Sequence, residues 1–136
     1  SDLLYNMRVF ALGFAFLACL LHVVFFGVEA FAPQLLLKSK PDQLNDSVRL
    51  LFFNQGFYNL FLALGGAYAT LKAWKENSTP ALLVFILLTM LGASIVLLFS
   101  NPSLLRGVLA QGVPPLFALG LFWFSKPCST MGGENL

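Results

Sequence analysis

Four long apolar segments constrain the fold of this chain more than any other feature of its sequence. They run from about Met7 to Ala32, Leu50 to Leu71, Pro80 to Phe99 and Leu104 to Phe124. Each has about the twenty residues that an α-helix, rising about 1.5 Å per residue, needs to cross a hydrocarbon core of about 30 Å. Helices satisfy their own backbone hydrogen bonds in lipid, and the alternating ten-residue segments of a barrel are absent from the sequence. The sequence therefore predicts an all-α integral membrane bundle of four transmembrane helices.

The composition agrees with a membrane protein. Of the 136 residues, 58% are hydrophobic and only 10% are charged, which lies far from the balance of a soluble domain. We expect a single membrane domain over residues 1–131, in a multi-pass protein of the bacterial inner membrane. The last five residues, "GGENL" at 132–136, resemble the start of a protease-cleavable tag linker and are left out of the fold.

The charges outside the apolar segments do not predict an orientation. Cytoplasmic loops are normally enriched in Lys and Arg. We call side A the face with the N-terminus, the second connection and the C-terminal tail, and side B the face with the first and third connections. Side A carries Arg8, Lys72, Lys75 and Lys126, and side B carries Lys38, Lys40, Arg49 and Arg106. The balance leaves two alternatives, an orientation set by other details or a dual-topology homodimer.

Polar side chains inside the apolar segments fall at two matching depths. At 1.5 Å per residue from side B, one group lies about 6–9 Å deep and the other about 15–16 Å deep. The shallower group is Glu29, Asn54, Gln55 and Gln111, and the deeper group is His22 and Asn59. Tyr58 shares a helix face with Asn54 at a spacing of four residues.

The spacing of these residues predicts a shared polar pocket. His22 and Glu29, seven residues apart, share one face of the first helix, and Gln55 and Asn59, four residues apart, share one face of the second. Polar groups within a membrane are costly and normally face the interior of a bundle or a water-filled cavity. We therefore expect a pocket among the first, second and fourth helices, open toward side B.

A structural interpretation of these residues stays open beside the functional one. Asn, Gln and His often hold membrane helices together through hydrogen bonds worth about 0.6–2 kcal/mol. Glu29 is the strongest functional candidate, because an amide could hold helices together without the cost of a charge. One histidine and one buried carboxylate are too few ligands for zinc. We predict neither a metal nor a cofactor.

Three sequence stretches resemble a known family. They are "HVVFFGVEAF" from His22 to Phe31, "NQGFYNLFLALG" from Asn54 to Gly65 and "QGVPPLFAL" from Gln111 to Leu119. These stretches are similar to the signature segments of the family called domain of unknown function 1304, which are small four-helix membrane proteins of bacteria and fungi. The resemblance covers nearly the whole chain before the linker and implies the fold and the membrane location. It implies no reaction, because the family has no established activity.

Two classes of function fit this pattern, and a third is plainer. In the first, the protein binds or transports a small molecule or lipophilic ligand, and Glu29 exchanges a proton or balances a cation. In the second, it is a membrane enzyme of isomerase or hydrolase type, in which His22 and Glu29 move protons on a lipophilic substrate. In the third, it is an accessory subunit packed on a larger membrane partner. Nucleic-acid binding is excluded, because the few basic residues are divided between the two sides.

Overall fold

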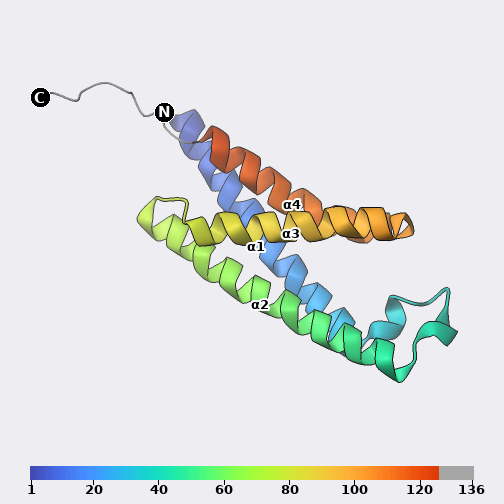
Figure 1. The fold of residues 1–136 in the computed structure, drawn as a ribbon. Helices are drawn as coiled ribbons and strands as arrows, with labels where there is room; N and C mark the ends of the chain where they lie inside the picture. The colour runs from blue at the N-terminus through green and yellow to red at the C-terminus, as the bar shows by residue number, and fades with distance from the viewer. Residues whose placement is uncertain (126–136) are drawn as a thin grey trace, which may run out of the picture.

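Four α-helices joined by short connections make up the part of the chain that the structure describes, residues 1–125 of a computed structural model (Figure 1). The linker prediction for residues 132–136 and the side-A charge Lys126 lie outside this part. The helices are α1 (Asp2–Phe31), α2 (Asp46–Glu76), α3 (Ala81–Ser100) and α4 (Leu105–Phe124). Short 3₁₀ turns, Pro33–Leu35, Pro41–Gln43 and Pro102–Leu104, occupy the first and third connections.

The prediction of an all-α fold with four helices is confirmed, but within residues 1–125 only three helices have both the length and the apolar character of a membrane span. These are α1, α3, and α4 together with the turn before it, Pro102–Phe124. The second helix, α2, is 31 residues long but carries charged residues near both ends and several amides between them. Its composition therefore falls short of that of a span. The three apolar helices indicate a membrane protein.

The ends of α2 are fixed by two asparagines. Asn45 is the N-cap, and its side-chain oxygen accepts a hydrogen bond of 3.0 Å from the backbone N–H of Val48. Asn77 ends the helix in the left-handed conformation, with φ 48°, which asparagine tolerates better than most residues. The α2–α3 connection is therefore a tight turn, and the two helices run in opposite directions.

The first helix is the centre of the bundle. It packs along α2 and along α4, and both neighbours run antiparallel to it. Antiparallel packing on α2 brings Arg8 beside Ala73 at one end and Glu29 beside Asn59 toward the other. In Figure 1, α3 crosses in front of α1 and pairs with α4. The two connections at side B therefore belong to different helical hairpins. One joins α1 to α2, and the other joins α3 to α4.

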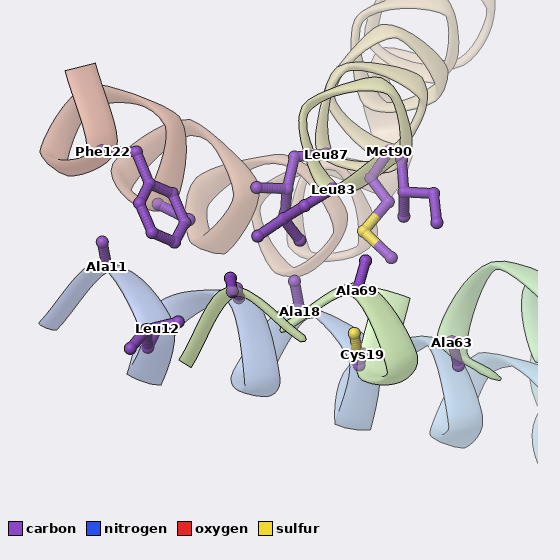
Figure 2. Packing of buried hydrophobic residues seen from close by; sticks show 14 residues of the cluster. Ala11, Leu12, Ala18, Cys19, Ala63, Ala69, Leu83, Leu87, Met90 and Phe122 are labelled. Atoms are coloured by element: carbon purple, nitrogen blue, oxygen red, sulfur yellow. The ribbon is translucent and has the colours of Figure 1, made fainter. Parts of the chain in front are cut away.

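Small residues on α1 and α2 face larger ones on α3 and α4 in the core. Figure 2 shows Ala11 beneath Phe122 of α4, and Ala18 and Ala69 beneath the side chains of α3, which include Leu87 and Met90. Alanine on facing helices lets the backbones approach closely, which replaces the hydrophobic driving force that helices lack in lipid. The small core residues of α1 and α2 are Ala11, Ala15, Ala18, Cys19, Ala63, Ala69 and Ala73, and the larger ones of α3 and α4 are Leu83, Ile86, Leu87, Met90 and Phe122.

Candidate functional site

The carboxyl group of Glu29 is hydrogen-bonded across the α1–α2 interface. The side-chain amide of Asn59 donates to Oε2 of Glu29 at 2.6 Å. Asn59 is buried, and Glu29 is half-buried. The other carboxyl oxygen, Oε1, accepts no hydrogen bond within residues 1–125. The Asn59 amide therefore fixes the direction of the Glu29 carboxyl group, and Oε1 stays available as a hydrogen-bond acceptor.

Gly56, one turn before Asn59, permits this bond. A Cβ atom at position 56 would lie 3.1 Å from both the backbone oxygen of Phe26 and the backbone nitrogen of Ala30. The α1 and α2 backbones therefore meet so closely at this point that a side chain at position 56 would push them apart by a few tenths of an ångström. This contact brings Asn59 within reach of Glu29 and sets the register of the two helices.

That register differs from the depth expected for Asn59. The sequence placed Asn59 level with His22, but the structure pairs it with Glu29. Ten residues of α2, from 46 to 55, precede Gly56, whereas only Phe31 follows Ala30 in α1. The second helix therefore extends past the end of α1 on side B, and depths counted from the two helix ends do not share an origin.

His22 lies two turns before Glu29 on α1 and is fully buried, with 0% of its surface exposed. Its Nδ1 is 2.8 Å from the backbone oxygen of Ala18, so Nδ1 carries the hydrogen and donates to that oxygen. The edge of the ring meets the ring of Phe25 at a centroid distance of 5.2 Å. Nε2 then presents a lone pair, and no donor within the described residues reaches it. An orphaned buried acceptor costs about 1–3 kcal/mol and calls for an explanation.

The remaining predicted site residues lie elsewhere. Asn54, Gln55 and Tyr58 are exposed on α2, where the depth argument expected interior positions. Depth fixes the level of a residue along a helix but not its direction, and at 3.6 residues per turn Tyr58 points about 100° away from Asn59. Gln111 is half-buried on α4 and makes no side-chain hydrogen bond within residues 1–125. The structure thus brings together Glu29 and Asn59, with His22 on the same helix.

Arg8 is a polar residue in the bundle that sequence reasoning missed as a site. Its guanidinium donates to the backbone oxygens of Ala73, at 2.8 Å, and of Ser78, and to the hydroxyl oxygen of Thr79 at 3.4 Å. The guanidinium carbon lies 5.7 Å from the centre of the Phe122 ring. Arg8 thereby joins α1 to the end of α2, to the following turn and to α4.

One feature of the sequence indicates that Arg8 needs partners inside the bundle. Arg8 is a charged residue inside the first apolar segment, where a charge is costly. An arginine within a predicted span normally needs polar partners, and the exposed carbonyls at the C-terminal end of a neighbouring helix supply them. Which helix end would lie beside Arg8 depended on the packing.

The arrangement around Glu29 and His22 offers hydrogen-bond acceptors rather than donors. One oxygen of Glu29 and Nε2 of His22 are free acceptors on one helix, about 10 Å apart along its axis at 1.5 Å per residue. The contacts of both residues are otherwise with their own helix, with α2 and with aromatic rings. These two acceptors can bind a ligand or a water molecule that donates a hydrogen bond, or they can take up a proton.

A comparison with known protein families matches residues 16–123 to the family described as "Protein of unknown function (DUF1304)". The chain belongs to this family. The match includes His22, Glu29, Asn59 and Gln111, and it begins after Arg8. No curated protein and no solved structure matches the chain. The family resemblance inferred from the three sequence stretches is therefore confirmed.

Proposed function

We propose that the protein binds a small lipophilic molecule through Glu29, and that it carries this molecule or a proton across the membrane. The observation that carries the proposal is the hydrogen bond from Asn59 to one oxygen of Glu29, which leaves the second oxygen free in the α1–α2 interface. A residue that served only to join the helices would not need a carboxyl group, because an amide would do so at lower cost. The ligand we propose carries a cationic or hydrogen-bond-donating group on an apolar body.

We include α2 in the proposal as a fourth membrane span. It accompanies α1 from Gly56, beside Phe26 and Ala30, to Ala73, beside Arg8. If α1 crosses the bilayer, a helix in contact with it over this length crosses as well. The amides that lower the apolar character of α2 include Asn59, which is paired with Glu29. The multi-pass topology, the bacterial inner membrane and the homodimer stay predictions from the sequence.

Glu29→Gln is expected to weaken ligand binding about ten-fold or more, because hydrogen bonds to a charged group are worth about 1.5–3 kcal/mol. The glutamine can still accept from Asn59, so the fold should be kept. Native mass spectrometry of the detergent-extracted protein would show a bound molecule in the wild type that is lost in Glu29→Gln. Gln55→Ala is the matched control, because Gln55 is an exposed amide of α2.

A second measurement covers a ligand that dissociates during purification. Uptake of the lipophilic cation tetraphenylphosphonium into proteoliposomes, driven by a pH gradient, should require Glu29 and not Gln55. A bound molecule that persists in Glu29→Gln would contradict the proposal. So would the absence of any bound molecule combined with uptake equal to that of empty liposomes.

The lone pair on Nε2 of His22 favours one alternative, a membrane enzyme in which His22 is the general base. Neutral imidazole with a free acceptor is the form that removes a proton from a substrate. If this holds, His22→Gln should lower product formation from a lipophilic substrate about 100-fold or more, the usual scale of general-base catalysis. Turnover would be followed by mass spectrometry with extracted membrane lipids as substrates. Equal turnover in wild type and His22→Gln would exclude this role.

A further inference from the structure

A groove at side A, far along the bundle from Glu29, has an arginine at one end and apolar walls. Its volume is about 580 Å³. From Arg8 it follows α1 inward, past Val9 and Leu12 to Phe16, which is eight residues or about 12 Å further along the helix. The groove is lined by Tyr5, Arg8, Val9, Leu12, Phe16, Trp74 and Asn77.

The arginine lies at the level where a membrane boundary is expected. The third helix has 20 residues and is about 30 Å long, which matches the hydrocarbon core, so its first residue, Ala81, marks one edge. Arg8 donates to Ser78 and Thr79, just before that edge. Tyr5 and Trp74, which line the groove, are residues typical of the membrane–water interface. The apolar walls therefore extend from the headgroup level into the acyl-chain region.

No carboxylate within residues 1–125 balances the positive charge of Arg8. Its hydrogen-bond partners are neutral oxygens, and it forms no ion pair within residues 1–125. Lys72 and Lys75 are exposed on the last turns of α2, on either side of Trp74 in the sequence, and one acidic residue, Glu76, follows them, so that Arg8 and the two lysines outnumber it. Basic residues close to the membrane surface attract anionic lipids. The mouth of the groove is therefore suited to an anion.

A second hollow of about 480 Å³ adjoins the first and shares Tyr5, Arg8 and Asn77 with it. Its other walls include the polar side chains of Ser78, Thr79 and Ser125. A free fatty acid would place only a carboxylate beside Arg8 and leave this polar hollow unused. A phospholipid headgroup would extend into it from the phosphate.

We infer that this groove binds a phospholipid with an anionic headgroup, its phosphate at Arg8 and one acyl chain along Val9, Leu12 and Phe16. The site is separate from Glu29 and does not depend on the function proposed there. Arg8 keeps its contacts with the end of α2, and the lipid phosphate supplies the counter-ion.

Trp74 lies in the groove and can report the bound lipid directly. In a Trp123→Phe background, Trp74 becomes the single tryptophan, because the chain has two. The protein is reconstituted in phosphatidylcholine vesicles that contain a lipid with brominated acyl chains, which quench tryptophan on contact. Brominated phosphatidylglycerol is expected to displace phosphatidylcholine from Trp74 about five-fold more effectively than brominated phosphatidylcholine does, the ratio that corresponds to about 1 kcal/mol. The preference should fall as salt is raised.

Two variants separate the site from a general attraction to anionic lipid. Val9→Phe places a ring in the groove without changing Arg8, and Val23→Phe is its control, because Val9 and Val23 are exposed valines of α1 and Val23 does not line the groove. The preference should approach one in Val9→Phe and stay about five-fold in Val23→Phe. Arg8→Gln should also lower it, because Lys72 and Lys75 keep only part of the positive charge. If Arg8→Gln fails to fold, the valine pair decides.

Three results would overturn the inference. The first is equal quenching of Trp74 by the two brominated phospholipids in the wild-type background. The second is a preference for phosphatidylglycerol that persists in Val9→Phe. The third is selection of brominated stearate over phosphatidylcholine without selection of phosphatidylglycerol, which would assign the groove to a free fatty acid.

Discussion

Asn59→Leu is expected to lower the free energy of unfolding by about 1–3 kcal/mol, because it leaves the Glu29 carboxyl group half-buried without its donor. The amide of Asn59 is the hydrogen-bond partner of Glu29 within the described residues. The measurement is reversible unfolding in mixed micelles, followed by circular dichroism. Asn54→Leu is the control on the same helix, because Asn54 is exposed, and it should change stability by no more than about 0.5 kcal/mol.

The double variant tests whether the loss comes from the unpaired carboxyl group. Glu29→Leu combined with Asn59→Leu should recover most of the stability, since removing both members of a buried pair costs far less than removing one. The coupling energy from the four variants should lie near 0.6–1.7 kcal/mol, about the range found for hydrogen bonds between membrane helices. Additive losses in the double variant would show that Glu29 and Asn59 do not interact in the folded protein.

Gly112→Ala is expected to lower the free energy of unfolding by about 1–3 kcal/mol through overpacking of the α3–α4 contact. A Cβ atom at position 112 would overlap Oγ of Ser94 and lie 2.8 Å from its Cβ. It would also displace the Ser94 hydroxyl, which donates to the backbone oxygen of Val108 at 2.7 Å. Thermal unfolding in detergent would measure the loss.

A compensating change makes this prediction specific. In a Ser94→Gly background the clashing atoms are gone, so Gly112→Ala should then be neutral or stabilising, as alanine is in a helix relative to glycine. Gly120→Ala is the matched control on α4, because nothing lies within 4 Å of a Cβ atom there. It should raise stability slightly. A loss of the same size for Gly112→Ala in both backgrounds would exclude Ser94 as the cause.

The sequence predicted the helices better than the site. The four apolar segments correspond to α1–α4, although α1 begins at Asp2 rather than near Met7 and α2 extends from Asp46 to Glu76. Helix length and apolar character are local properties, so they can be read without knowing what a helix touches. The family resemblance could also be recognised without knowledge of tertiary contacts, because it rests on three short stretches of sequence.

The site was predicted in part. Glu29, His22 and Asn59 were named from the sequence, and the structure makes Asn59 the partner of Glu29 and leaves His22 with a free Nε2. The sequence grouped Asn59 with His22 by depth and placed Gln55 in the interior. Both differences arise because a distance along one helix specifies neither the stagger of its neighbour nor the direction of a side chain around the axis.

By itself, then, the sequence determined an all-helical membrane protein of this family, with a carboxyl group inside its first apolar segment, because these properties follow from residue order along one chain. Only the tertiary structure decided which groups meet. Gly56 sets how α1 and α2 slide past each other, and so which amide reaches Glu29. The packing of α1 against the ends of α2 and α4 gives Arg8 its partners. Such contacts depend on close packing between segments distant in sequence, which no local pattern encodes.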